Sequence, residues 1–464
     1  MWRLHGRPRF LVPQPKALRE RKNRRFLGVV DAIPNIASTA SSARQRLLLI
    51  APHGSYRTAP FIDAANKLDV DVLVASEGKH SIVSVYADGL VLDLSNIDAA
   101  LETIVDVAKT GAFVAVIGTD DATTELAMLA AERLGLPHNP LAAVRCARRK
   151  DLARQRLAQQ GVPVPGFRRI DLNARLGKQV EKVRFPCVLK PLTLSASRGV
   201  IRVDTPEQFF DACARIQQLL QHEGIAERDT LLAEDFVPGA EVAVEGLLTG
   251  GKLKILAIFD KPDALNGPYF EETYYVIPSR LDAATQLLLR QRVQQACRAY
   301  GLQEGPVHAE CRINADGVWI LEVAARTIGG LCGRLLRFGA GCSLEELVLA
   351  HSLGHKPSVA KVEGGAGVLM IPVPDAGILR RVEGVMAAQR VPYVEEVVIG
   401  VREGYELVPW PEGSSYLGFI FARAPTADHA EAALREAHGC LNFVVAPLWK
   451  LSAQSQSARA GALR

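Results

Sequence analysis

Two glutamates on neighbouring apolar stretches are the residues best suited to chemistry. Residues 305–313 and 318–326 read as the two strands of a hairpin. With a three-residue loop at 315–317, Glu310 lies directly opposite Glu322. Like charges facing each other destabilise a sheet, so we expect a cation between them. Mg²⁺, which is bound jointly by carboxylates and phosphates, is the natural candidate. An ordinary solvated sheet face is the alternative.

Further residues extend this pattern toward phosphate chemistry. Arg326 follows the second glutamate by four positions and precedes a glycine pair at 329–330. Lys190 ends an apolar strand at 185–191, and a stretch of small residues follows at 193–199. The backbone amides of such a loop, with a lysine at its base, can cradle phosphate oxygens. A solvated strand end is the alternative for Lys190. Together the residues indicate a phosphoryl-transfer site.

The elements that must position these residues begin with an N-terminal α/β unit. Short apolar strands at 46–50, 70–75 and 113–117 alternate with helical stretches, which predicts a doubly wound parallel sheet. Ligands of such sheets collect at the carboxyl ends of the strands, here the loops at His53 and Asp120. The sequence contains neither a complete G-x-G-x-x-G nor a G-x-x-x-x-G-K-[ST] pattern. A nicotinamide or Walker-type site is therefore disfavoured.

Two further units follow. A helix at 150–160 leads into a proline-rich connector, and a Pro-Gly bend between Glu234 and Glu241 suits a hinge between two lobes. From Gly364 onward, strands and turns alternate and predict a small β-rich domain. We therefore expect a basic disordered tail at 1–45, an α/β domain at 46–148, a two-lobed central domain at 149–357, a β-rich C-terminal domain at 358–451 and a disordered tail at 452–464.

Charge and composition narrow the function classes. The net charge is +5, but residues 1–46 hold eleven Lys or Arg against two acidic residues, which leaves about −4 for the rest. A folded part with that balance disfavours nucleic-acid binding. The basic arm could also be a targeting segment or an over-long translation start. No apolar run reaches membrane-spanning length. The eight cysteines lack zinc spacing and indicate reduced thiols, so we expect a cytoplasmic protein with no membrane partner.

Taken in order, these motifs resemble those of the ATP-grasp carboxylate–amine ligases, especially the bacterial L-amino-acid ligases, from about residue 150 to residue 353. The resemblance implies a two-lobed ATP-grasp fold between the α/β and β-rich domains. It also implies that the chain uses ATP and Mg²⁺, with two ions, to form an amide (peptide-type) bond through an acyl phosphate. The substrates would be a small carboxylate donor and an amine acceptor, at least one of them an amino acid. A homodimer stays open as the assembly state.

The same resemblance implies roles for individual residues. Glu310 and Glu322 would bridge magnesium, Arg326 would steady the acyl phosphate, and His308, on the same strand face as Glu310, would face the reacting amino acid with the loop 270–280. The nucleotide-binding residues it implies are Lys150 and Lys190 for the phosphates, Ser195, Ser197 and Gly199 in the covering loop, Glu234 for the adenine amino group, Val237 at the hinge and Glu241 for the ribose.

One position departs from the usual family pattern. Ala324 stands where most members carry an asparagine as a third metal ligand. Because the L-amino-acid ligases also depart there, we interpret it as a subgroup trait. Two alternatives remain: a biotin-carboxylase-like enzyme, for which no biotinyl carrier domain is visible, and an ATP-binding module with degenerate catalysis, which Ala324 alone favours.

Overall fold

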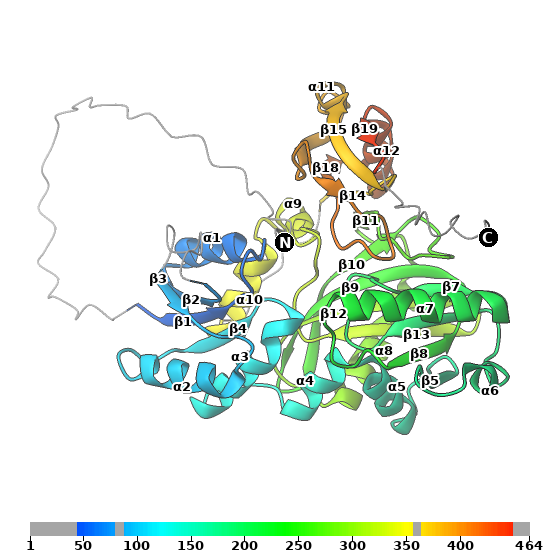
Figure 1. Cartoon of the computed structure of the whole chain (residues 1–464). Helices are drawn as coiled ribbons and strands as arrows, with labels where there is room; N and C mark the ends of the chain where they lie inside the picture. Colours follow the sequence, from blue (N-terminus) through cyan, green and yellow to red (C-terminus); the bar gives the residue numbers. More distant parts are fainter. Residues whose placement is uncertain (1–43, 79–87, 356–362, 449–464) are drawn as a thin grey trace, which may run out of the picture.

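The computed structural model describes residues 44–78, 88–355 and 363–448. In Figure 1 the N-terminal unit lies at the left and the C-terminal region lies at the top. A separate four-stranded sheet with its long helix α7 (Pro206–His222) lies at the right. The tails predicted at 1–45 and 452–464 fall outside the described residues, apart from residues 44 and 45. The border predicted at residue 357 also lies outside them, and the border at residue 148 stays a prediction.

The N-terminal unit is a parallel sheet of order β3-β2-β1-β4, as the alternating pattern predicted. Alternate residues of β1 (Arg46–Ile50) point to opposite faces. Leu47 and Leu49 pack against α1, whereas Leu48 and Ile50 pack against α2 and α3. Both faces are covered, so the sheet is doubly wound. The other elements are α1 (Thr58–Leu68), β2 (Asp71–Ser76), β3 (Asp88–Val91), α2 (Ile97–Ala108), β4 (Ala115–Gly118) and α3 (Asp121–Arg133).

A smaller lobe is built on an antiparallel sheet of order β5-β8-β6-β7. Its long helix α7 begins where the Thr205 side chain accepts the backbone N–H of Gln208 (3.3 Å) and Pro206 fills the first helical position. Phe209 and Ile216 of α7 are buried against the sheet. The elements are β5 (Phe167–Asp171), α6 (Leu176–Val180), β6 (Cys187–Pro191), β7 (Ile201–Val203), α7 (Pro206–His222) and β8 (Thr230–Asp235).

The largest sheet has eight strands in the order β13-β12-β9-β10-β11-β14-β18-β16. Its first five strands belong to the central region and its last three to the C-terminal region, and Tyr274 pairs with Leu369 at the junction. The sequence did not predict that the two regions share one sheet. The strands are β9 (Ala240–Thr249), β10 (Lys252–Lys261), β11 (Tyr274–Ile277), β12 (Gly305–Asn314), β13 (Gly317–Ala324), β14 (Gly365–Ile371), β16 (Val394–Ile399) and β18 (Gly418–Ala424).

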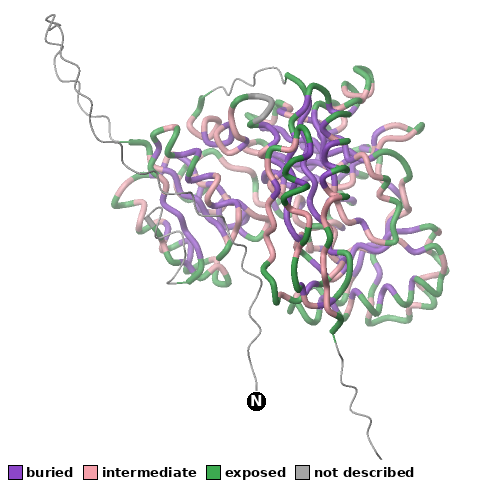
Figure 2. Tube along the Cα trace, turned by 90° about the horizontal axis from the view of Figure 1, so that it is seen from above, coloured by how far each residue is buried: buried purple, intermediate pink, exposed green. Residues whose placement is uncertain are grey.

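Helices cover this sheet, and its strands carry much of the buried core seen in Figure 2. The long helix α8 (Ala283–Tyr300) starts at Asp282, which accepts the N–H of Thr285 (2.9 Å), and ends at Gly301 in the left-handed conformation. Leu289 packs with the central strands. The remaining helices of the central region are α4 (Leu141–Arg148), α5 (Lys150–Gln159), α9 (Arg334–Ala340) and α10 (Leu344–Ser352).

The C-terminal region completes the molecule with a three-stranded sheet of order β17-β15-β19. Helix α12 packs on β14 and β18, and its Leu434 and Ala437 lie in a buried cluster that also includes Leu379 of β15. No helix among the described residues combines the length and apolar character needed to cross a bilayer. The remaining elements are β15 (Gly377–Glu383), α11 (Val385–Ala388), β17 (Glu406–Leu407), α12 (Ala427–Gly439) and β19 (Asn442–Ala446).

Candidate active site

The candidate active site is a cavity of about 740 Å³ bounded by the small lobe, the eight-stranded sheet and the edge of the N-terminal sheet. Eleven of the twelve site residues predicted from the sequence line it, which brings together positions from Lys150 to Arg326. The twelfth, Gly199, lies just behind the wall, where its N–H donates to the carbonyl of Pro411 (2.9 Å). A cleft in which a few charged groups converge on an otherwise apolar wall is the usual form of a small-molecule site.

The two predicted phosphate lysines enter from different elements. Lys150 begins α5, and its Nζ donates to the carbonyl of Leu194 (2.7 Å) and lies 3.4 Å from Glu322. Lys190 stands at the end of β6, where its Nζ donates to Glu234 (2.7 Å). Burial lowers the pKa of Lys190, although the Glu234 carboxylate opposes that shift. Lys150 therefore lies against the start of the small-residue loop, and both lysines line the cavity.

Glu234 is a buried charge held by two cations. The guanidinium of Arg154 lies 2.6 Å from one carboxylate oxygen, and Lys190 binds the other. Burial alone would raise the pKa of Glu234, but Arg154 and Lys190 lower it to about 2. The carboxylate therefore stays ionised and anchors Lys190. Its predicted contact with an adenine amino group stays a prediction.

Arg312 organises the predicted hinge and ribose positions. It is almost fully buried, donates to the carbonyl of Val237 (2.7 Å) and to the carboxylate of Glu241 (2.9 Å). The sequence analysis did not single out Arg312, although its place two residues after Glu310 on the same strand face was a usable signal. The hinge backbone and Glu241 are thus fixed to β12, the strand that carries Glu310.

The predicted pairing of Glu310 with Glu322 is confirmed, but the predicted turn is wrong. Asn314 pairs with Gly317, so the loop has two residues rather than three. A β-bulge after Glu310 leaves Leu321 unpaired and restores the register. The freed carbonyl of Leu321 accepts from Arg154 (2.7 Å).

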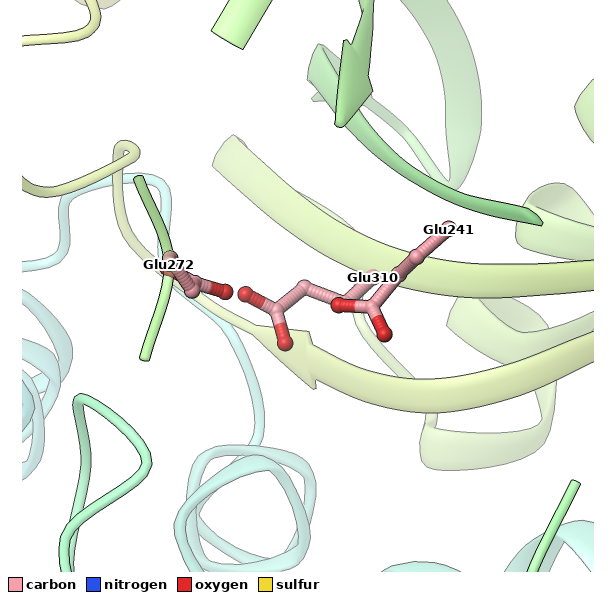
Figure 3. A group of neighbouring side chains, drawn as sticks. All are labelled: Glu241, Glu272 and Glu310. Atoms are coloured by element: carbon pink, nitrogen blue, oxygen red, sulfur yellow. The ribbon is translucent and has the colours of Figure 1, made fainter. Parts of the chain in front are cut away.

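The charge between the paired glutamates is balanced by two lysines. Lys150 approaches Glu322, while Lys261 lies 3.3 Å from Glu310. Lys261 also contacts Glu241 (2.8 Å) and Glu272, so its ammonium group sits among three carboxylates. Figure 3 shows Glu241, Glu272 and Glu310 pointing toward one another. The sequence analysis missed Lys261, whose signal was a lysine at the end of a buried strand.

These three carboxylates also form a group whose oxygens could each supply one metal ligand, since the oxygens lie within 4.8 Å of one another. Their protonation is uneven. Burial and the nearby Glu310 raise the pKa of Glu272 to about 7, whereas Lys261 and His308 hold the pKa of Glu310 below its usual range. Glu310 is therefore the member that stays anionic, as a metal-bridging carboxylate must.

His308 is a buried cation rather than a base. Its Nδ1 lies 3.1 Å from Glu245, and its Nε2 lies 3.6 Å from Glu310. Burial opposes the charge, but these two carboxylates raise the pKa of the imidazole to about 9. At neutral pH the ring is protonated and holds two acidic side chains in place. The predicted catalytic role of His308 stays a prediction.

Arg326 joins the cavity to the N-terminal unit. Its Nη2 lies 2.8 Å from Asp121 at the start of α3, and its Nη1 donates to the carbonyl of Thr327 (2.9 Å). The buried guanidinium of Arg57, which the sequence analysis did not single out, donates to the carbonyls of Thr119 and Thr327. Loops of the parallel sheet therefore reach the active site, as the strand-end rule suggested.

Of the two strand-end loops predicted to meet a ligand, at His53 and Asp120, the residue Asp120 reaches the cavity. Asp120 lines the cavity and accepts from Ser55 (2.9 Å), so the loop after β1 and the loop after β4 meet. His53 is absent from the cavity wall among the described residues. The segment near Glu272, predicted as a substrate contact, also reaches the cavity through Phe270 and Glu272.

Comparison with known proteins adds family information. Residues 183–334 match the family described as an ATP-grasp domain, and residues 369–446 match L-amino acid ligase C-terminal domain 2. The chain is similar to an L-amino acid ligase from Bacillus licheniformis of known crystal structure, with a TM-score of 0.73 and 26% identity over 87% of this chain and 100% of that one.

Two further proteins are similar to this chain in amino-acid sequence. The uncharacterized protein y4rH of Sinorhizobium fredii (strain NBRC 101917 / NGR234) is 23% identical over 91% of this chain and 87% of its own length. The alanine–anticapsin ligase of Bacillus subtilis (strain 168) is 26% identical over 50% of this chain, a match that spans only 52% of that ligase.

Proposed function

We propose that this chain, which carries an ATP-grasp domain followed by an L-amino acid ligase C-terminal domain, is an ATP-dependent carboxylate–amine ligase that forms a peptide-type bond through an acyl phosphate. The observation that carries the proposal is the convergence of Lys150, Lys190, Glu310, Glu322 and Arg326 on one cavity. This set contains the cations and carboxylates that phosphoryl transfer to a carboxylate requires.

The proposed reaction has two steps. A substrate carboxylate oxygen attacks the γ-phosphorus of ATP, which forms the acyl phosphate and releases ADP. The amine nitrogen then attacks the acyl carbon, the amide bond forms and inorganic phosphate leaves. Little covalent work falls to the protein, because positioning and charge neutralisation supply most of the rate.

The residues take complementary roles in this scheme. Lys150 and Lys190 bind the nucleotide phosphates as point charges, and the amides of 195–199 cover them. Arg326, held by Asp121, presents its remaining guanidinium N–H groups to the transferring phosphoryl group or to the substrate carboxylate. The protonated His308 supports Glu310 rather than accepting a proton.

The carboxylates fit Mg²⁺. Glu310 is anionic, faces Glu322 across the hairpin and lines the same cavity. The ion would supply charge neutralisation on the phosphates. We propose two ions, as the resemblance implied. Ala324 is buried, pairs with His308 and offers no ligand, so water or phosphate oxygens would have to complete the ligand set of the second ion.

An amino acid is the proposed carboxylate donor or amine acceptor. The cavity wall mixes opposite charges, since Arg57, Arg334 and Glu345 are among the residues that line it. Such a wall suits a zwitterion, because a buried site that pairs both an ammonium and a carboxylate group rejects analogues lacking either.

The test uses the purified full chain with ATP, Mg²⁺ and the twenty amino acids, singly and in pairs, while ADP release and condensation products are followed by mass spectrometry. We expect ADP and a dipeptide in equal amounts. ADP release that needs bicarbonate and biotin would support a carboxylase instead, and nucleotide binding without turnover would support a degenerate ATP-binding module.

Two coarser expectations belong with this proposal. A cytoplasmic location is supported by the eight free cysteines, none of which forms a disulfide among the described residues. A homodimer is tested by light scattering of the chain at concentrations used for the assay.

A further inference from the structure

We propose that the C-terminal segment 408–416 holds the phosphate-covering loop 194–199 in its closed position, with Trp410 as the positioning residue. The inference deepens the proposed function, because it assigns to the C-terminal region a part in ATP-dependent ligation. It concerns two segments more than 200 residues apart in the sequence, each of which donates a hydrogen bond to the other.

The phosphate-covering loop has a conformation that needs support. Ala196 and Ser197 have φ values of 56° and 54°, both in the left-handed region. Two successive L-residues there are costly, and such backbone persists where surrounding structure fixes it. Within the loop, the N–H of Arg198 reaches the carbonyl of Ser195 at 3.3 Å, which is a long bond. Most of the fixing therefore comes from outside the loop.

Lys150 holds the carbonyl of Leu194 (2.7 Å) and Arg198 pairs with Glu223 (2.9 Å), while the left-handed turn itself forms two hydrogen bonds with the C-terminal segment. The indole N–H of Trp410 donates to the carbonyl of Ala196 (3.0 Å). In return the backbone N–H of Gly199 donates to the carbonyl of Pro411 (2.9 Å). The two hydrogen bonds fix the loop at both ends of its left-handed turn. A side chain at Gly199 could not sit there, because its Cβ would lie 2.8 Å from Pro191.

Glu412 adds contacts at the outer edge. Its carbonyl accepts from Arg198 (3.3 Å), and its carboxylate binds Arg215 of α7 (2.8 Å). The ion pair between Arg215 and Glu412 is partly exposed, so it contributes little to the stability of this contact. Its role is to orient the segment on the small lobe. The segment thus touches both the loop and the helix behind it.

The other side of the segment reaches the cavity. The ring of Trp410 packs on Tyr416, with centroids 4.9 Å apart. Tyr416 and Ser414 line the cavity, whereas Trp410 is 5% exposed and lies behind the wall. One aromatic pair therefore connects the cavity wall to the carbonyl of Ala196. A substrate that contacts Tyr416 can therefore bias the closed loop through Trp410.

This arrangement suits a reaction with a water-sensitive intermediate. An open loop admits ATP, but it would also admit water to an acyl phosphate. Because the closed loop depends on the C-terminal segment, its closure is linked to the part of the cavity wall formed by Tyr416. Trp410 touches neither nucleotide nor substrate, so its effect is on loop position and coupling.

The experiment replaces Trp410 by phenylalanine in the full chain, which deletes the indole donor and keeps an aromatic ring against Tyr416. ADP and amide are measured together at several ATP concentrations. We expect the apparent KM for ATP to rise about fivefold, the factor equivalent to one hydrogen bond. The share of ADP released without amide should also rise. Trp319→Phe, which removes another indole hydrogen bond on β13 (3.1 Å to Asn314), is the matched control.

A second readout does not depend on turnover. Trypsin cleavage after Arg198, followed with and without a non-hydrolysable ATP analogue and Mg²⁺, reports how often the loop opens. Trp410→Phe should be cleaved faster than the wild type and than Trp319→Phe, while all three keep the same melting temperature. Equal cleavage rates would overturn the proposal. If the wild type forms no amide, the proposed function fails, but the cleavage comparison still decides whether Trp410 holds the loop.

Discussion

The guanidinium of Arg326 lies 2.8 Å from the carboxylate of Asp121, and this ion pair ties the residue after β13 to the first turn of α3. The pair is nearly enclosed, since the two side chains are 10% and 25% exposed. Burial alone would lower the pKa of Arg326, but Asp121 raises it above its usual value. The N-terminal sheet therefore sets the orientation of a cation in the candidate active site.

The first prediction concerns this pair. Asp121→Asn replaces the carboxylate by a neutral amide of nearly the same size, so Arg326 loses its ion pair. We expect kcat to fall by about tenfold or more with a smaller change in the KM for ATP, because Arg326 acts at the transferring group and not at the bound nucleotide. Steady-state kinetics check this. Asp98→Asn, on the surface helix α2, is the control, and equal effects of both variants would contradict the role of Asp121.

Lys190→Ala is expected to weaken ATP binding. The ammonium group faces the covering loop and also neutralises Glu234, so its loss leaves that buried carboxylate with Arg154 alone. The apparent KM for ATP should rise by at least tenfold, or turnover should be lost in a variant that still folds. Calorimetric titration with ADP measures the change. Lys178→Ala on the exposed helix α6 should behave as the wild type, and an unchanged ATP dependence in Lys190→Ala would remove this lysine from the site.

Glu310 and Glu322 are expected to act as one unit. Each single change to glutamine should reduce kcat nearly as much as the double change, because residues that hold one metal–phosphate assembly are non-additive. A Mg²⁺ titration of each variant gives the second measurement, with a higher ion concentration needed for half-maximal rate. Glu395→Gln on exposed β16 is the control. Additive losses, or full activity in excess EDTA, would contradict the metal assignment.

Glu271 offers a prediction on stability against pH. Its Oε1 is buried without a hydrogen-bond partner, and burial raises the pKa of the carboxyl to about 7. Because the folded pKa lies above the usual 4.5, the native state binds more protons than the unfolded state between these values. The contribution of Glu271 to the free energy of unfolding is therefore intact below pH 4.5 and is lost as the pH rises through 7.

Glu271→Gln should accordingly raise the melting temperature at pH 8 and leave it nearly unchanged at pH 4.5. Thermal unfolding of both proteins across this range measures the difference. Glu403→Gln, at an exposed position of the same C-terminal half, serves as the control. A difference between Glu271→Gln and the wild type that does not grow with pH would show that the carboxyl is not held protonated by burial.

Local sequence patterns predicted much of the site. An assumed three-residue loop placed Glu310 opposite Glu322, and a strand end followed by small residues located Lys190 beside its loop. The turn between the glutamates was predicted one residue too long, since a bulge at Leu321 compensates for the tight turn and leaves no signature in residue types. Two opposite errors in register therefore gave the correct pairing.

Residues that depend on distant partners were not predictable. Lys261 has only its place at a strand end as a local signal and Arg57 has none, and only the fold brings Lys261 to Glu272 or Arg57 to Thr327. The pairing of β11 with β14 likewise joins strands about 90 residues apart, which no local period encodes. Hydrophobic pattern thus identified the strands but not their long-range order.

The sharing of one sheet between the central and C-terminal regions has a mechanical consequence. The eight strands from β13 to β16, in sheet order, form one continuous slab, so those two regions cannot rotate independently without breaking a ladder such as Tyr274 with Leu369. The chain crosses into the four-stranded lobe and back through two short links, 160–166 and 236–239. A movement of that lobe relative to the slab would therefore turn about an axis through these links, with the slab as the fixed side.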